Sequence, residues 1–233
     1  YPHAVSLLAA ADDAVDAVRA PHEGLAGALR IALPMDASVA FLSAPILSFA
    51  AAHPALRLSL DLNDQHVDLT AGGHDVALRI GRLPDSGLRA RRLCQSPRVT
   101  CAAPSYVDAR GEPRGPDTLS DHDVIHYSNA PASQVWRFAP EAGGAAVFVQ
   151  VTPRIACNNG AKMRAAAEAG LGVTVLPLFV VEEALAAGRL RQVMAGWTPE
   201  PDDLFALTPP ARQASPKVRA FIDHMVAAMA QLR

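Results

Sequence analysis

The chain has 233 residues, a formal net charge of −2, 50% hydrophobic residues and 19% charged residues. This much apolar material supports a large buried core and excludes a disordered chain. A domain that binds nucleic acid directly usually has a strong excess of basic residues. This chain has no such excess, so we expect any role with nucleic acid to be indirect. At about 100–200 residues per domain, the length fits one large domain or two small ones.

The cysteines and the N-terminal residues bear on location. Cys94, Cys101 and Cys157 form no CxxC pair. An odd, sparse set is typical of a reducing compartment, so we expect a cytoplasmic protein. No uninterrupted apolar run approaches the roughly 18 residues of a membrane span, and Asp12 and Asp16 lie where a signal peptide would be apolar. We therefore expect no membrane contact.

The first part of the chain predicts alternating strands and helices. Residues 1–20 have a thin apolar stripe at helical spacing and predict a connector helix. Strand periodicity follows at 27–33, where Leu29, Ile31 and Leu33 alternate with smaller or polar residues, and strict alternation predicts a strand at 56–62. A third strand is predicted at 75–80. Between them we predict a helix that Asp36 or Ser38 caps, and a short helix at 67–70. This order predicts a parallel sheet with right-handed crossovers. The first helix has the apolar stripe Val39, Leu42, Ile46 and Phe49, and we expect Leu47, Phe49 and the strand Leu56–Leu62 to lie mainly in the core.

The second part predicts shorter elements. Gly143-Gly144 marks a hairpin turn between strands at 135–138 and 145–151. We interpret Gly170-Leu171-Gly172 as a helix C-cap and turn, since a phosphate loop would precede a helix. Other strands are predicted at 88–93, 98–103, 124–127, 172–176 and 204–207, and other helices at 104–109, 116–120, 158–169 and 178–187. The last helix has a predicted inner face of Val218, Phe221, Ile222, Met225, Met229 and Leu232.

Few residues suggest catalysis or metal binding. His122 and His126 are four apart, which on a helix would form half a zinc site, but the residues between them indicate a strand. There is no GxSxG, HExxH or Walker motif. The remaining pieces, Asp85-Ser86 and His66 with Asp68, form no acid/base or nucleophile set. We therefore expect no enzyme activity, no catalytic residue, no metal and no cofactor.

Two strand-to-helix junctions have polar residues suited to a ligand. They are Pro34-Met35-Asp36-Ala37-Ser38 and Cys157-Asn158-Asn159-Gly160. In open α/β sheets, ligands bind beyond the carboxyl ends of strands and against helix N-termini. Simple helix capping accounts for the same residues, and spacing alone does not separate the two interpretations.

Five segments, in order, together carry a resemblance. They are GALRIALPM with HPALRLSLDLND, HVDLTAGGHDVALRIGRLPDSGLRARRL, CAAPSYVDARGEPRGPDTLSDHDVIHYSN, NNGAKMRAAAEAGLGVTVLP and SPKVRAFIDHM. Across residues 27–233 they resemble the effector-binding domain of LysR-type transcriptional regulators. Residues 1–20 then resemble the end of the linker helix that joins this domain to a DNA-binding head.

The resemblance implies an α/β fold of two Rossmann-like subdomains, in a type 2 periplasmic-binding-protein-like arrangement with a ligand cleft between them. Subdomain I would comprise 27–95 and 202–233, and subdomain II 96–201. The hinges would be Leu93–Arg98 and Trp197–Pro201. In the family, DNA is bound through an N-terminal winged helix-turn-helix, which we expect to be missing here.

The resemblance also implies a ligand site. In subdomain I it involves the loop after the first strand, the loop after the second strand at Asp64 and Gln65, and the end of the third strand. The implied ligand-binding residues are Met35, Asp36, Ala37, Ser38, Gln65, Arg79, Gly81, Ala103, Tyr127, Ser128, Asn158 and Asn159.

Asp36 departs from the family pattern, which often has a small hydroxyl residue at this position. An ionised aspartate cannot donate a hydrogen bond to an anionic effector and repels a carboxylate. One interpretation is that Asp36 only caps its helix while Ser38 donates to the effector. The other is that the effector is cationic, amine-bearing or neutral at that end.

The resemblance favours a sensor module of a transcription factor that binds a small-molecule effector and forms a homodimer or homotetramer. Effector binding would shift the hinge and so the geometry of the assembly. A solute-binding protein of the same fold that serves transport is the alternative. It would need an export signal, and the helical connector at 1–20 favours the regulator.

Overall fold

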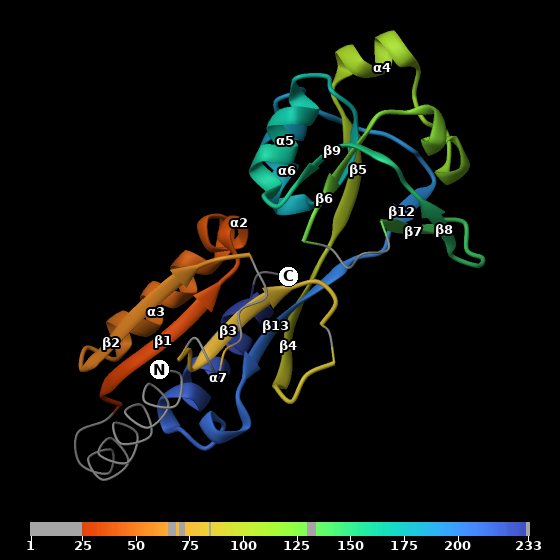
Figure 1. Cartoon of the computed structure of the whole chain (residues 1–233). Helices are drawn as coiled ribbons and strands as arrows, with labels where there is room; N and C mark the ends of the chain where they lie inside the picture. Colours follow the sequence, from red (N-terminus) through yellow and green to blue (C-terminus); the bar gives the residue numbers. More distant parts are fainter. Residues whose placement is uncertain (1–24, 65–68, 70–72, 84, 130–133, 232–233) are drawn as a thin grey trace. The chain divides into compact units, whose positions relative to one another are not determined.

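The protein is described by a computed structural model that covers residues 25–64, 69, 73–83, 85–129 and 134–231 (Figure 1). The chain divides into two compact units: unit 1 contains the residues up to Gln95 and those from Asp203 onward, and unit 2 is Ser96–Asp202. The predicted connector helix at 1–20, the helix at 67–70 apart from Leu69, the site residue Gln65, and Leu232 lie outside the described residues.

Unit 1 is built on a five-stranded sheet in the order β2-β1-β3-β13-β4. Its strands are β1 (Gly27–Leu33), β2 (Leu56–Leu62), β3 (Val76–Ile80), β4 (Arg89–Ser96) and β13 (Asp202–Thr208). β1 pairs in parallel with both β2 and β3, so the predicted parallel sheet is confirmed for these strands. β13 pairs antiparallel to β3 and brings the C-terminal part of the chain back to this sheet.

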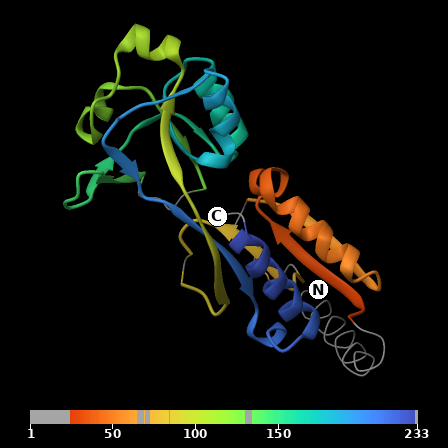
Figure 2. The ribbon, with the colours of Figure 1, turned by 180° about the vertical axis from the view of Figure 1, so that it is seen from behind.

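Two helices pack side by side on one face of this sheet (Figure 2). The first is a continuous helical segment made of α2 (Met35–Ala37), the π-helical η1 (Ser38–Leu42) and α3 (Ser43–Ala52). The second is α7 (Pro216–Gln231). Phe49 and Phe221 meet edge-on between them, with ring centroids 5.3 Å apart. Both rings are fully buried, as expected from the apolar stripes of the two helices.

Several apolar residues that were predicted to be in the core are exposed instead. Val39 is 78% exposed and Leu47 is 63% exposed. The π-helical turn at Ser38–Leu42 contains more residues per turn than an α-helix, which rotates Val39 away from the stripe of Leu42, Ile46 and Phe49. The strand β2 lies at the edge of the sheet, and only its first residue, Leu56, is buried.

The segment Met35–Ala52 is long and apolar enough to cross a membrane, by length and composition only. In this fold its Leu42, Ile46 and Phe49 are buried. Asp36, Ser38, Ser43 and Ser48 interrupt the segment, so it is not an uninterrupted apolar run. The same test is passed by core helices of proteins that never enter a membrane, so this feature is weak evidence of a span.

A buried carboxylate joins the returning C-terminal segment to the sheet. Asp75 precedes β3, is 4% exposed and accepts a hydrogen bond from the Arg30 backbone N–H at 2.8 Å. The Arg212 guanidinium, in η3 (Pro210–Arg212), lies 3.4 Å from the other carboxylate oxygen. The buried Lys217 ammonium at the start of α7 adds an electrostatic contribution. Burial raises the pKa of Asp75, while the Arg30 N–H and Lys217 favour its charged form.

Unit 2 contains a mixed sheet in the order β11-β5-β10-β6-β9. β6, β9 and β10 are parallel, whereas β5 runs antiparallel to β10. Its strands are β5 (Arg98–Ala102), β6 (Val124–Tyr127), β9 (Pro153–Cys157), β10 (Val173–Pro177) and β11 (Arg191–Gln192). Its helices are α4 (Pro104–Arg110), the 3-10 helix η2 (Pro116–Asp121), α5 (Gly160–Glu168) and α6 (Leu178–Ala186). The strand β9 was not predicted, because it begins at a proline and only partly buries its side chains.

A second, three-stranded sheet of unit 2 has the order β12-β7-β8. It comprises β7 (Val135–Pro140), β8 (Val147–Gln150) and β12 (Trp197–Pro199). β7 and β8 pair antiparallel, and the glycines between them have positive φ, which confirms the predicted hairpin. Trp136 and Phe138 of β7 are buried in the core of unit 2, whereas Phe148 on β8 is 63% exposed.

The turn after α5 confirms the interpretation of Gly170-Leu171-Gly172. The Gly170 N–H donates to the Ala167 carbonyl at 2.9 Å, and both glycines have positive φ. A Cβ at position 172 would lie 2.5 Å from the Asp123 carbonyl oxygen, so only glycine fits there. The segment is a helix end that brings the chain into β10.

The packing of α3 against α7 predicts the effect of a core mutation. We expect Phe221→Ala to lower the free energy of unfolding by about 3–5 kcal/mol, because it leaves a cavity beside Phe49. The measurement is urea unfolding followed by circular dichroism. Phe148→Ala is the matched control, and we expect a loss below about 1 kcal/mol because that ring is exposed and the Arg137 guanidinium lies over it. Equal losses in the two variants would contradict the assignment of this core.

Candidate functional site

The polar residues predicted in unit 1 lie at one edge of its sheet. β1, β2 and β3 are parallel, so their carboxyl ends share that edge. Met35, Asp36, Ala37 and Ser38 follow β1, Asp64 follows β2, and Arg79 and Gly81 lie at the end of β3. All the unit 1 residues that the resemblance implied, apart from Gln65, which lies outside the described residues, are thus at this edge.

Asp64 holds this edge together. One of its carboxylate oxygens accepts a hydrogen bond from the Met35 backbone N–H at 2.8 Å, which satisfies an N–H at the start of the helical segment. Burial raises the pKa of Asp64, the Met35 N–H opposes this, Asp36 raises it further and Arg79 lowers it. The edge therefore combines two carboxylates and one guanidinium within electrostatic reach of each other.

The predicted helix cap is wrong. The N-cap residue is Pro34, whose own side chain forms no capping hydrogen bond, and the helical segment begins at Met35, before Ser38. Asp36 is in the first turn, where the helix dipole favours a negative charge. The Ser38 hydroxyl is buried and donates to the Pro34 carbonyl. Its single proton is therefore already used, so in this conformation Ser38 cannot be the donor to an effector.

The end of β3 turns sharply back into the fold. The Arg79 guanidinium donates to the carbonyl of its neighbour Leu78 at 3.0 Å, which folds the side chain against its own strand. Gly81 has a φ of 108° and donates its N–H to the Asp203 carbonyl at 3.0 Å. This backbone conformation, rather than a contact with a ligand, accounts for glycine at position 81.

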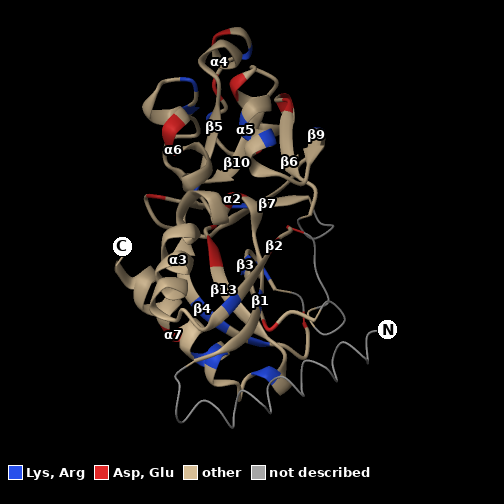
Figure 3. Ribbon diagram, turned by 90° about the vertical axis from the view of Figure 1, so that its left-hand side faces the viewer, with Lys and Arg blue, Asp and Glu red and all other residues tan. Residues whose placement is uncertain are grey.

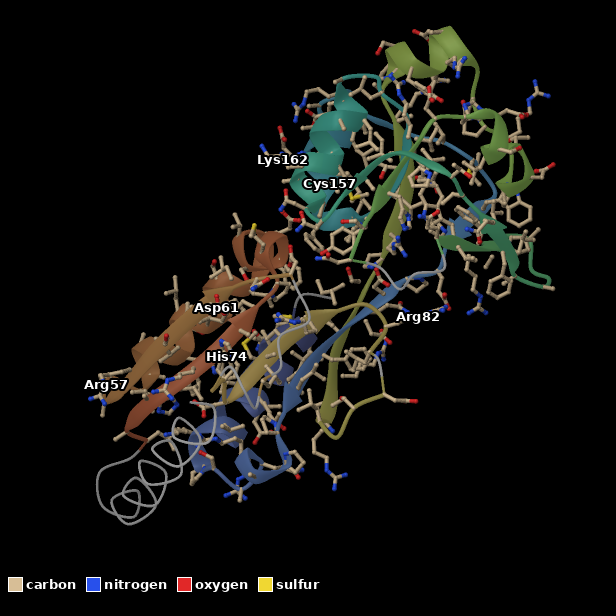
Figure 4. The ribbon with its side chains drawn as sticks, in the orientation of Figure 1. Arg57, Asp61, His74, Arg82, Cys157 and Lys162 are labelled. Carbon is tan, nitrogen blue, oxygen red and sulfur yellow. The ribbon has the colours of Figure 1, made fainter. Side chains whose placement is uncertain are left out.

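In unit 2, the predicted residues lie at the carboxyl ends of β6 and β9. The Ser128 N–H donates to the Cys157 carbonyl at 2.9 Å, which places Tyr127-Ser128 beside Asn158. The Asn159 side chain caps α5 by accepting from the Lys162 backbone N–H at 2.9 Å, as the capping interpretation predicted. Figure 4 shows Cys157 and Lys162 near each other at this junction. The amide of Asn158 is exposed beside the helix N-terminus.

The structure does not bring Ala103 to this edge. β5 runs antiparallel to β10, with Arg98 opposite Pro177 and Cys101 opposite Thr174. The chain therefore reaches Ala103 at the end of the sheet where β6 begins, opposite to Tyr127 and Ser128. Ala103 is also 2% exposed and belongs to the core of unit 2. The reversed direction of one strand is not visible in its sequence.

The two histidines that could suggest a zinc site have other partners. The His122 ring lies 3.3 Å from the Tyr106 hydroxyl. His126, on β6, accepts a hydrogen bond at Nδ1 from Trp136 Nε1 at 3.0 Å. Within the described ranges no group of three or more His, Cys, Asp or Glu side chains could hold a metal ion.

Comparison with known proteins identifies the class. Residues 22–230 match the LysR substrate binding domain family. The chain is 31% identical to an uncharacterized HTH-type transcriptional regulator of Escherichia coli, YhjC, over 88% of this chain and 69% of that protein. It is 32% identical to the HTH-type transcriptional regulator PtxR of Pseudomonas aeruginosa, over 94% and 70% respectively. Both relatives are therefore longer than the chain.

Solved structures agree with this class. The regulatory domain of CrgA from Neisseria meningitidis superposes with a TM-score of 0.73 at 26% identity, over 88% of this chain and 99% of that domain. The chain belongs to the LysR family and is the substrate-binding domain of a LysR-type transcriptional regulator. The predicted family and the predicted type 2 periplasmic-binding-protein-like fold class are confirmed, and the regulator is favoured over a transport protein.

The His126–Trp136 contact predicts how stability changes with pH. Burial, followed by the charge of Arg98, lowers the pKa of His126 below its ordinary value of 6.5, and burial likewise lowers that of His122. The unfolded chain then binds more protons than the folded one below about pH 6.5, so stability is lost as the pH falls through this value. Protonation would also place a proton on the Nδ1 atom that accepts from Trp136.

We expect the contribution of His126 and His122 to the free energy of unfolding to fall between about pH 7.5 and pH 5.5. His126→Gln should show a smaller fall, because the contribution of His126 is removed while His122 and the other titratable groups stay as they are. Urea unfolding at the two pH values measures both. Identical pH dependence in the two proteins would show that His126 is not responsible.

Proposed function

We propose that this chain senses a small-molecule effector on behalf of a DNA-binding transcriptional regulator in the bacterial cytoplasm. DNA would be bound by an N-terminal helix-turn-helix of the longer protein, as the names of the relatives suggest. Unit 1 would be regulatory subdomain I and unit 2 regulatory subdomain II. The observation that carries the proposal is the match to a substrate binding domain, together with the polar residues at the carboxyl ends of the parallel strands.

The effector would bind at these polar edges. In unit 1 the residues would be Met35, Asp36, Ala37, Ser38, Asp64, Gln65, Arg79 and Gly81. In unit 2 they would be Tyr127, Ser128, Asn158 and Asn159, which offer amide and hydroxyl groups beside the α5 N-terminus. Ala103 is left out, because β5 takes it to the other end of its sheet.

The charge of the unit 1 edge favours an effector with an amine or another cationic group. Asp36 and Asp64 supply two carboxylates there. Burial raises the pKa of Asp64 and the charge of Asp36 raises it further, and a positive charge on an effector would favour the ionised form against both. The only hydroxyl of this helix start, that of Ser38, already donates to Pro34. A simple carboxylate would therefore meet like charges and lack this donor.

A thermal-shift screen of amines, amino acids and simple acids tests the effector class. We expect amine-bearing compounds to raise the melting temperature of the wild type, and Asp36→Ser to lose most of this shift. A ligand at a hundred times its Kd contributes about 2.7 kcal/mol, which is readily seen. Asp223→Ser, which removes an exposed carboxylate from α7, is the matched control and should keep the shift.

Two outcomes count against this interpretation in different ways. Simple acids that stabilise the wild type as well as Asp36→Ser would overturn the cationic effector but keep a ligand site at this edge. Stabilisation by any ligand that persists in both Asp36→Ser and Asn158→Ala would move the site away from the polar edges.

Unit 1 also exposes an apolar surface that we propose as a contact with a second copy of the chain. This surface consists of Val39, Leu47, Leu60 and Leu62, each between 43% and 78% exposed. Scattered exposed apolar residues are ordinary, but these four come from one helical segment and the adjoining edge strand. Burying them against a second copy would remove this apolar area from water.

Light scattering at several concentrations tests the dimer contact. We expect the wild type to dimerise and Leu47→Asp to be shifted to monomer, because a carboxylate in an apolar contact is poorly solvated. Phe148→Asp, which changes an equally exposed residue in unit 2, should still dimerise. A dimer that withstands Leu47→Asp would exclude this surface.

A further inference from the structure

We infer that the exposed β4 edge of unit 1 makes a second, sequence-independent contact with the phosphates of the DNA that the regulator binds. This goes beyond the proposed function, and rests on it only in that DNA is the partner of the longer protein. The contact would add to that of a DNA-binding head and would carry no sequence information.

The inference begins with two arginines on the last strand of a sheet. β4 ends the strand order of unit 1, so β13 is its only neighbouring strand among the described residues. Arg89 and Arg91 are two residues apart, so their side chains leave the same face of the strand about 7 Å from each other. Both are exposed, and no described side chain forms an ion pair with either of them. By contrast, the next residue, Arg92, is 2.7 Å from the Asp203 carboxylate.

The charge of unit 1 supports an anionic partner. Residues 25–95 and 203–233 contain eleven Lys and Arg against eight Asp and Glu, whereas residues 96–202 contain nine against eleven. The net charge of the chain is near zero, but these residues of unit 1 have a positive net charge and unit 2 has a negative one. Figure 3 shows basic residues on and around β4.

The position of β4 also fits DNA held by the same polypeptide. β1 and β4 begin at the same end of the unit 1 sheet (Figures 1 and 2). β1, the first described strand, begins at Gly27, so the part of the chain that precedes this strand is connected at this end of the sheet. A tether of this kind raises the effective concentration of DNA near β4, and weak contacts then become significant.

The side chains around the arginines favour phosphates over an acidic protein. The exposed start of β4 reads Arg89-Ala90-Arg91-Arg92 and contains no large apolar side chain. Protein interfaces are centred on apolar and aromatic residues, which are missing from this stretch. Guanidinium groups bind phosphate through two parallel hydrogen bonds, and phosphates repeat along any DNA sequence.

The test is a nuclear magnetic resonance titration of this chain with a duplex of about 20 base pairs of arbitrary sequence, since this method detects the millimolar binding expected of two contacts. We expect the amide signals of residues 89–93 to shift. The affinity should fall about sevenfold between about 20 and 60 mM salt, the change for two phosphate contacts. The double variant Arg89→Gln/Arg91→Gln should lose these shifts while its other signals show an intact fold.

The control and the competing outcomes are defined by charge. Arg114→Gln/Lys162→Gln removes the same charge from exposed positions of unit 2 and should leave the shifts unchanged; Lys162 is labelled in Figure 4. Binding that survives in the Arg89/Arg91 variant, or is lost equally in the control, overturns the inference. Shifts at β4 with a polyglutamate peptide but not with DNA would assign the surface to an acidic protein instead. None of these results depends on the effector. A negative result here therefore counts against the DNA contact alone, and a negative thermal-shift screen counts against the effector site alone.

Discussion

The parallel pairing of β1 with strands on both of its sides is the constraint on which unit 1 depends. Leu29, Ile31 and Ala32 of β1 are fully buried, so the strand is covered on both faces as well as both edges. Because β2 and β3 run in the same direction, the loops that follow all three strands meet at one edge. Asp64 can therefore reach the Met35 N–H, although the two residues are far apart in the sequence. The direction of the strands therefore determines which loops come together at the candidate site, and the side chains of those loops then determine its chemistry.

The sequence predicted strand direction where the local pattern was strong. Strict alternation in Leu56–Leu62 and a helix between two strands were enough to predict the parallel sheet that β1, β2 and β3 form. The direction of β5 was not predictable in this way, since a short and almost wholly buried strand has no local signal for the direction in which it pairs. That reversal is the reason why Ala103 does not join the other residues of unit 2. The exposure of Val39 was equally hidden, because a π-helical turn has no clear signal in a short apolar stretch.

The site residues divide according to how they were predicted. Asn159 was visible from spacing as a helix cap, and the structure shows that hydrogen bond. The grouping of Asp36 with Arg79 came from the resemblance to the family, because no local pattern connects residues on different strands. Asp64 has a role that neither approach supplied: it replaces the missing side-chain cap of the helical segment from another loop. A cap supplied by a residue far away in the sequence depends on tertiary structure. The only local indication of it is an N-cap residue that cannot cap the helix itself, such as Pro34.

The return of β13 and α7 to unit 1 has a consequence for synthesis on the ribosome. Unit 2 is one continuous stretch of chain and can be completed as soon as Asp202 has emerged. Unit 1 is translated first but lacks β13, the partner of β3, and the ring of Phe221 that packs on Phe49 until the end of translation. The charges around Asp75 also remain incomplete until Arg212 and Lys217 arrive. The N-terminal half of the domain is therefore the last to be finished, and its apolar surfaces stay exposed longest in the nascent chain.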